Sequence, residues 1–153
     1  MVIKSPSVMS GYLGRPDLTA AVLVDGWYHT GDAGHIDEAG LIRLTGRIKD
    51  EINRAGFKVQ PAEIDALLET HPAVSEACVF GVPDLVSGQI VAAAVCLAAG
   101  AKADAQSLRQ WCATRLRHEA IPERWFIVDE IPRNNRGKIN REDVRQGLTR
   151  GSQ

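Results

Sequence analysis

Long hydrophobic runs, aromatic residues and a surplus of one charge are all scarce in this sequence of 153 residues. The longest apolar run, Ile90–Ala99, is about half of the roughly 20 residues that a membrane-spanning helix needs. Lys and Arg total 18 against 19 Asp and Glu, so no chain-wide cationic surface for nucleic acid or anionic lipid is expected. The first residues lack the basic segment followed by an apolar segment that marks a signal peptide. We therefore expect a cytoplasmic protein without a membrane span.

Cysteine and histidine are also few and scattered. The three cysteines, Cys78, Cys96 and Cys112, are odd in number, and they lack the close spacing of zinc ligands. Because free cysteine is among the most buried residue types, we expect small buried side chains in a reducing compartment. The four histidines form no cluster either, so we expect no metal site in this chain.

Glycine and turn residues, by contrast, are dense in the first third of the chain. Short apolar runs lie between them, and Asp37–Gly40 is typical of a hairpin turn between residues 35–36 and 41–45. So few residues of this kind make a poor core alone. We therefore interpret residues 1–45 as the β-rich end of a larger domain, followed by a hinge at residues 46–50.

The remaining residues, 51–150, have an α+β pattern. Pro61 suits the first position of a helix, and Asp104 and Asn140 suit N-caps. Apolar residues from Gln89 to Leu97 predict a strand covered on both faces. The predicted helices are 61–70, 104–118 (with Leu108, Trp111, Cys112, Arg115 and Leu116 on its buried side) and 141–150, and the predicted strands are 74–82, 89–97 and 124–129.

One motif precedes the predicted hinge, and a second motif includes it. In the first, residues 27–32 (WYHTGD), Asp32 offers two acceptor oxygens that suit vicinal hydroxyls such as those of a ribose. In the second, residues 46–65, Arg47 could grip a phosphate or sugar hydroxyls, Lys49 marks the change in composition, and Gly56 would let the backbone approach a ligand closely. Taken singly, each of these residues also fits an ordinary turn or surface charge.

The third motif, residues 131–141 (IPRNNRGKINR), presents Lys138 between a glycine and an isoleucine. Its ammonium is a compact charge that can neutralise a carboxylate and a phosphate as they approach each other. The competing interpretation is a solvated basic loop. A nucleotide P-loop is excluded because Pro132 stands where the first glycine of that motif is required.

Together and in this order, the three motifs resemble the C-terminal part of the adenylate-forming superfamily, which includes acyl-CoA synthetases, adenylation domains of peptide synthetases and luciferases. The resemblance implies a small C-terminal lid domain with a central three-stranded sheet, flanking helices and a β-hairpin, preceded by a β-rich tail of the large N-terminal domain. It also implies two steps. A carboxylate attacks ATP to give an acyl-adenylate, and a thiol of CoA or of a carrier protein then takes the acyl group.

By motif position, the resemblance implies a role for each candidate residue. Asp32 and Arg47 would bind the nucleotide, Lys49 would be the hinge, and Lys138 would bridge carboxylate and α-phosphate in the first step. Gly56 would line the thiol channel in the second. Mg²⁺ would accompany ATP, held mainly by phosphates and by residues outside this chain. Because the family's phosphate loop and acyl pocket are absent, we expect the isolated chain to be inactive and its partner to be the large adenylating domain.

Two other functions compete with this interpretation. One is a docking or regulatory lid module without catalysis of its own. The other is a nucleic-acid binder that uses the local basic cluster of Arg133, Arg136, Lys138, Arg141 and Arg145, although no aromatic residue interleaves with it for stacking on bases.

Overall fold

The computed structural model describes residues 1–150, and the chain divides into two compact units. Unit 1 is Met1–Lys49 and unit 2 is Asp50–Gln153. The boundary lies inside residues 46–50. That these residues act as a hinge stays a prediction.

Unit 1 is built from short elements. They are β1 (Val2–Ile3), α1 (Pro16–Val22), β2 (Leu23–Val24), β3 (Trp27–His29), β4 (Asp32–Ile36) and β5 (Ile42–Arg47). Antiparallel pairing gives a small sheet in the order β1-β3-β2 and a separate β4–β5 hairpin. The prediction of short strands and turns missed α1, which begins at Pro16 with Asp17 in its first turn. Both residues suit a helix N-terminus. An N–H group at the first helical position has no partner within the helix, so Pro costs nothing there, and an acidic side chain interacts favourably with the helix dipole.

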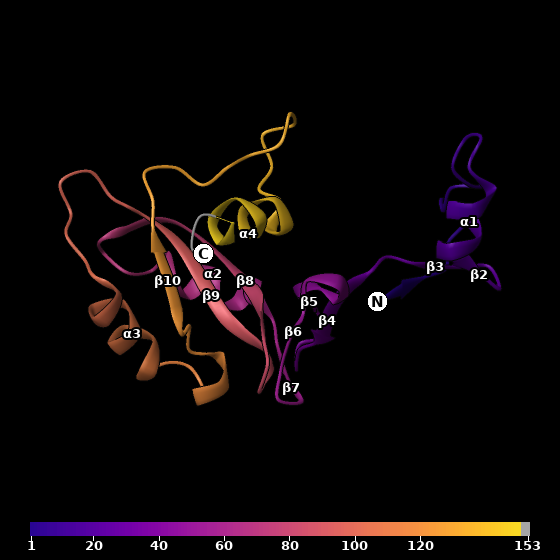
Figure 1. Cartoon of the computed structure of the whole chain (residues 1–153). Helices are drawn as coiled ribbons and strands as arrows, with labels where there is room; N and C mark the ends of the chain where they lie inside the picture. The colour runs from indigo at the N-terminus through magenta and orange to yellow at the C-terminus, as the bar shows by residue number, and fades with distance from the viewer. Residues whose placement is uncertain (151–153) are drawn as a thin grey trace. The chain divides into compact units, whose positions relative to one another are not determined.

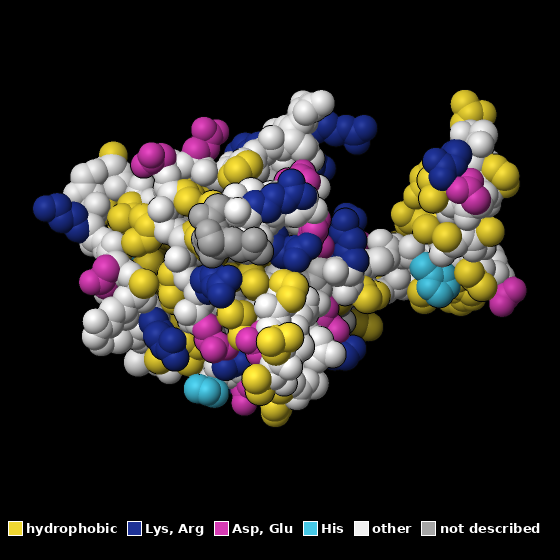
Figure 2. Space-filling model, viewed as in Figure 1, with side chains coloured by type: hydrophobic (Ala, Val, Ile, Leu, Met, Phe, Trp, Pro, Cys, Tyr) yellow, Lys and Arg dark blue, Asp and Glu magenta, His cyan; other side chains and the backbone are white. Residues whose placement is uncertain are grey.

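The predicted hairpin turn of unit 1 is confirmed. Asp37 Oδ1 accepts hydrogen bonds from the N–H groups of Ala39 (3.0 Å) and Leu41 (2.8 Å), and Gly40 has a φ of +79°. No residue within residues 1–49 is buried. In the space-filling view, hydrophobic side chains lie over much of the surface of the part that contains α1 and β1–β3 (Figure 2).

Unit 2 contains the longer elements. They are the 3₁₀ turn η1 (Ile48–Asp50, which spans the boundary), β6 (Ile52–Arg54), β7 (Phe57–Val59), α2 (Pro61–Leu68), β8 (Val74–Asp84), β9 (Gly88–Leu97), α3 (Ala105–Ala113), η2 (His118–Ala120), β10 (Arg124–Ile127) and α4 (Arg141–Thr149). Strands β8, β9 and β10 form the predicted centre of the sheet, with β8 antiparallel and β10 parallel to β9 (Figure 1). The β6–β7 hairpin joins β9 at the Arg54–Gly88 pair and extends the sheet to five strands.

Strand β9 is covered on both faces, as its apolar run predicts. Every residue of Val91–Cys96 is buried. Helices α2 and α3 cover one face through a cluster that includes Ile64, Leu68 and Leu108. Helix α4 and Ile131 cover the other face.

The helix starts are confirmed, but the end of α3 is not. Asp104 and Ser107 form a capping box, and the Asn140 side chain accepts the Glu142 N–H at 3.2 Å. Helix α3 ends at Ala113 rather than near His118. As a result Arg115, predicted on its buried side, is exposed and lies over the Trp111 ring with its guanidinium carbon 3.6 Å from the centroid.

No helix among the described residues combines the length and the apolar character that a bilayer-spanning segment requires.

Candidate functional site

Asp32 and Arg47 lie opposite each other across the β4–β5 hairpin. The two residues pair in register, and Arg47 Nε lies 3.3 Å from Asp32 Oδ1. Gly31 precedes the aspartate with a φ of +75°, and the Asp32 N–H donates to Thr30 Oγ1 at 3.0 Å. The Arg47 side chain is 60% exposed, so its outer edge is open to a ligand. The fold thus brings together two residues that are 15 positions apart and offers carboxylate acceptors beside guanidinium donors.

Lys49 lies between a residue that is hydrogen-bonded within unit 1 and a residue that is paired within unit 2. Its side chain is exposed in η1. On one side of it, the Ile48 N–H donates to the Gly31 carbonyl at 2.8 Å, within unit 1. On the other side, Asp50 Oδ2 lies 3.8 Å from Arg141 Nε, within unit 2. Each neighbour of Lys49 is therefore held by a different unit.

Gly56 is the second residue of the two-residue turn between β6 and β7. Ala55 and Gly56 have φ values of +48° and +89°, as in type I′ hairpin turns. A Cβ added to Gly56 would meet nothing within 4 Å, so glycine is required by backbone conformation rather than by space. The Gly56 N–H donates to Asn53 Oδ1 at 3.0 Å. The tip of this hairpin is open enough for another molecule to approach its backbone.

Lys138 lies on a small, well-braced turn that is exposed to solvent. Asn134 braces it, because its Oδ1 accepts the N–H groups of Arg136 (2.9 Å) and Lys138 (3.0 Å) and its own N–H donates to the Lys138 carbonyl (2.9 Å). Arg133 donates to the Gly137 carbonyl at 2.9 Å and also pairs with Glu76 on β8. Within the described part of the chain, no acidic side chain pairs with the Lys138 ammonium. The main chain of the turn is held by hydrogen bonds, whereas the Lys138 ammonium that it carries is not paired with a carboxylate of the described residues.

The four predicted binding and catalytic residues belong to different units. Asp32 and Arg47 lie in unit 1, and Gly56 and Lys138 lie in unit 2. Within unit 2 the two turns are far apart. Figure 1 shows the β6–β7 turn at the bottom of the sheet and the loop that leads into α4 at the top.

The sequence interpretation missed an ion-pair network below the Lys138 turn. Arg141 Nη2 lies 2.7 Å from Asp65 Oδ2 on α2, and Arg141 Nη1 donates to the Val79 carbonyl at 2.9 Å. Asp65 Oδ1 also accepts the Val79 N–H at 2.6 Å. Burial raises the pKa of Asp65, although the Arg141 guanidinium acts in the opposite direction. One signal was available in the sequence. An arginine at the first position of a helix opposes the helix dipole, which indicates a tertiary partner.

The same pairing reduces the charge of the predicted basic cluster. Arg133 pairs with Glu76, Arg141 with Asp65, and Arg145 with Glu142. Three of the five cations in that cluster are therefore compensated by carboxylates. This weighs against a nucleic-acid interface at this loop, because phosphate binding needs uncompensated positive charge.

The cysteines give no sign of thiol chemistry. All three are free and buried, as predicted. Burial raises the pKa of Cys78 to about 12 and that of Cys112 to about 11, so neither is a thiolate near neutral pH. Among residues 1–150, no three or more His, Cys, Asp or Glu side chains are grouped so that they could hold a metal ion.

Comparisons of this chain with known proteins agree on one family. Residues 63–138 match the family described as "AMP-binding enzyme C-terminal domain". The chain is 45% identical over 143 residues to a fatty acid–[acyl-carrier-protein] ligase, ScoC, of Streptomyces coeruleorubidus, and the match covers 94% of this chain and 28% of that protein. It is 41% identical over 144 residues to an oxalate–CoA ligase of Arabidopsis thaliana, with 94% and 28% covered.

A solved structure agrees with these relatives. The amide bond synthetase McbA of Marinactinospora thermotolerans matches with a TM-score of 0.90 and 39% identity, over 96% of this chain and 30% of that one. The chain thus spans about three tenths of the length of the relatives it matches, and it corresponds to their C-terminal portion. The chain belongs to the adenylate-forming superfamily, as the part that contains the AMP-binding enzyme C-terminal domain.

Proposed function

We propose that this chain is the C-terminal part of an ATP-dependent acid–thiol ligase. In the first step a carboxylate oxygen attacks the α-phosphorus of ATP, the bond to pyrophosphate breaks, and an acyl-adenylate forms. In the second step a thiol of CoA or of a carrier protein attacks the acyl carbon, and AMP leaves. Unit 1 would be the end of the large adenylating domain, and unit 2 would be its lid.

The single observation that carries this proposal is the unpaired Lys138 ammonium on a rigid, exposed turn. In the first step this ammonium would lie between the attacking carboxylate and the α-phosphate and would stabilise both negative charges. At ~4 Å and an effective dielectric of about 20, one such contact contributes on the order of 4 kcal/mol before desolvation is subtracted. Because Asn134 and Arg133 already fix the turn, little further ordering is needed when the substrates arrive.

The nucleotide would be held from unit 1. The Asp32 carboxylate is the acceptor for the ribose hydroxyls, and Arg47 beside it keeps that carboxylate charged and oriented. Mg²⁺ bound to ATP would neutralise phosphate charge. The described residues include no group of three or more His, Cys, Asp or Glu side chains that could hold this ion.

The second step would use the other end of unit 2. Rotation about Lys49 withdraws Lys138 and brings in the open Gly56 hairpin, along whose backbone the pantetheine arm would lie. Two turns at opposite ends of one rigid unit suit this exchange, because one enters as the other leaves. The named relatives are a carrier-protein ligase, a CoA ligase and an amide bond synthetase, so more than one class of acceptor occurs among them.

Lys138→Ala tests the proposal in a hybrid that joins this chain to the N-terminal part of the Streptomyces ligase, with which it is 45% identical over the shared region. We expect adenylate formation, measured as fatty-acid-dependent ATP–pyrophosphate exchange, to fall by about 10²–10³-fold. Thioester formation from supplied acyl-adenylate should change little, because Lys138 is withdrawn in that step.

Arg136→Ala is the matched control. Arg136 is an exposed cation on the same turn, and only its main chain bonds to Asn134. Its loss should leave both half-reactions near the unsubstituted rate. An equal fall of both half-reactions in Lys138→Ala would refute the role of Lys138. Two unchanged rates would support a docking or regulatory module without catalysis instead.

A further inference from the structure

Two partly buried arginines lie next to the two functional turns of unit 2. Arg54 ends β6, two positions before Gly56, and Arg141 begins α4, three positions after Lys138. Their side chains are 16% and 21% exposed. Each guanidinium pairs with one close carboxylate and donates to at least one main-chain carbonyl oxygen, two for Arg54 and one for Arg141. We call each arginine together with these partners an anchor. The two anchors use the same kinds of contact.

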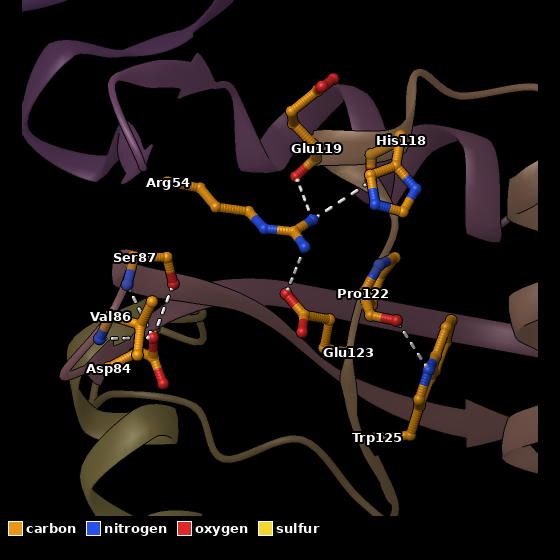
Figure 3. A network of polar contacts seen from close by, with 9 residues as sticks. All are labelled: Arg54, Asp84, Val86, Ser87, His118, Glu119, Pro122, Glu123 and Trp125. Carbon is orange, nitrogen blue, oxygen red and sulfur yellow. Dashed lines mark hydrogen bonds and ion pairs between the residues drawn. The ribbon is translucent and has the colours of Figure 1, made fainter.

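The Arg54 anchor fixes the β6–β7 hairpin to the segment before β10 (Figure 3). Arg54 Nη1 donates to the carbonyl oxygens of His118 (3.1 Å) and Glu119 (3.0 Å), and Nη2 lies 2.7 Å from Glu123 Oε1. Figure 3 shows the guanidinium between these groups, all of which lie more than 60 positions away in the sequence. A planar fork with several donors can hold all three acceptors at once, which a lysine cannot do in the same geometry.

A second support lies against the same hairpin. The Ala55 N–H donates to the Ser87 carbonyl at 2.7 Å. The β8–β9 turn that carries Ser87 is closed by Asp84, whose Oδ2 accepts from the Val86 N–H (3.1 Å), the Ser87 N–H (2.8 Å) and the Ser87 hydroxyl (2.7 Å) (Figure 3). The Gly56 turn is thus held on one side by Arg54 and on the other by a braced turn.

The Arg141 anchor fixes the other functional turn. It ties the start of α4 to Asp65 on α2 and to Val79 on β8. Arg141 Nε also lies 3.8 Å from Asp50, the residue directly after Lys49. Arg141 therefore connects the end of the Lys138 turn to the core of unit 2 and to Asp50, beside the proposed hinge. The Arg54 contacts and the Arg141 contacts share no residue.

We infer that Arg54 and Arg141 are positioning residues for opposite half-reactions: Arg141 holds the Lys138 turn for adenylate formation, and Arg54 holds the Gly56 hairpin for thioester formation. This inference rests on the proposed function. Both guanidinium groups are occupied by protein partners, so each would act through the turn beside it. A displacement of about 1 Å in a group that acts on the reacting atoms can cost on the order of 10²-fold in rate.

The test compares Arg54→Met and Arg141→Met in the hybrid enzyme, with both half-reactions and the thermal unfolding midpoint measured for each. We expect Arg141→Met to lower adenylate formation by about 10–100-fold and thioester formation from supplied acyl-adenylate by less than about 3-fold. Arg54→Met should show the reverse. Each variant is the control for the other, because both remove a comparable anchor from the same unit.

Arg54→Lys and Arg141→Lys keep the test decisive if a methionine variant fails to fold. Lysine leaves a positive charge facing Glu123 or Asp65 but loses the fork that reaches the carbonyl oxygens. The losses should then be smaller, about 3–10-fold, and in the same half-reaction as for methionine.

Two results would overturn the inference. If both arginine variants lower both half-reactions by the same factor, in step with lost stability, the anchors are only structural. If Lys138→Ala itself fails to separate the half-reactions, the proposed function fails and the inference falls with it. A separation in Lys138→Ala without one in the arginine variants refutes the positioning roles alone.

Discussion

The two units of this chain differ in how they treat their hydrophobic side chains. Unit 2 buries them in two clusters on the two faces of its sheet. Unit 1 buries no residue, although it carries most of the exposed large hydrophobic side chains of the described chain. Its strands, of two to six residues, are held by main-chain pairing and by turns.

The difference teaches which unit can be stable by itself. Burial of apolar surface is the main favourable term in folding, and a few short strands without it are marginal in water. Unit 2 therefore has the features of an independent folding unit. We propose that unit 1 is completed by the large adenylating domain, whose surface would cover the apolar side chains of its strands.

The largest expected contrast comes from truncating one leucine in each unit. Leu108 is fully buried, whereas Leu44 is 61% exposed. Leu108→Ala should lower the free energy of unfolding by about 2–5 kcal/mol through lost burial and a residual cavity. Leu44→Ala should change it by less than about 0.5 kcal/mol. Urea unfolding of the whole chain, followed by far-UV circular dichroism, measures both; equal effects would remove the distinction between the units.

A smaller contrast comes from two glycines with positive φ and open space around them, Gly56 (+89°) and Gly40 (+79°). An alanine in this conformation costs roughly 1–2 kcal/mol. Gly56→Ala should lower the stability of unit 2 by that amount, because the hairpin is part of its sheet. Gly40→Ala should leave the main unfolding transition in place. A shift of that transition by Gly40→Ala would show that the β4–β5 hairpin unfolds together with unit 2.

The smallest contrast concerns two aspartates, Asp104 and Asp37. The Ser107 N–H lowers the pKa of Asp104, and the Leu41 N–H and then Arg43 lower that of Asp37. A lowered pKa in the folded state stabilises the fold above the unfolded pKa of about 3.9, and this contribution is lost as the pH falls through the folded value. Asp104→Ala should therefore lower the unfolding midpoint at pH 7, by less than Gly56→Ala, and the difference should shrink as the pH falls through the lowered pKa of Asp104.

Asp37→Ala is the control for that titration. Its carboxylate supports only the turn of unit 1, so the main transition should not move at any pH. A pH-independent effect of Asp104→Ala would mean that the side chain acts by something other than its charge.

Most of unit 2 was predictable because its elements carry local signals. The predicted strand 74–82 is observed as Val74–Asp84, and the predicted helix 141–150 as Arg141–Thr149. The end of α3 was not predictable. Beyond Ala113 the chain turns so that the carbonyl oxygens of His118 and Glu119 accept from Arg54, about 64 positions away. No local pattern contains that long-range contact.

The candidate site was predictable in part for the same reason. The motifs predict accessible positions for Asp32, Arg47 and Lys138, and all three are exposed or partly exposed. Only Lys138 lies in a turn; Asp32 begins β4 and Arg47 ends β5, because the two residues pair across the hairpin. The pairing of Asp32 with Arg47 depends on the register of the hairpin. The Arg141–Asp65 pair depends on the packing of α2 and α4 against β8 from the two faces of the sheet. Such contacts arise only when the sheet forms, so the sequence gives at most an indirect sign of them.

The junction of the two units is tested most directly by Lys49→Pro in the hybrid enzyme, with the rates of both half-reactions measured. Lys49→Ala is the control, because it removes the charge but leaves the backbone free to rotate. Proline fixes φ near −65°. If one rigid unit serves both steps by turning about residue 49, Lys49→Pro should keep one half-reaction near its normal rate and lower the other by about 10²-fold, while Lys49→Ala changes neither strongly. Two half-reactions that both proceed at the normal rate in Lys49→Pro would contradict the account.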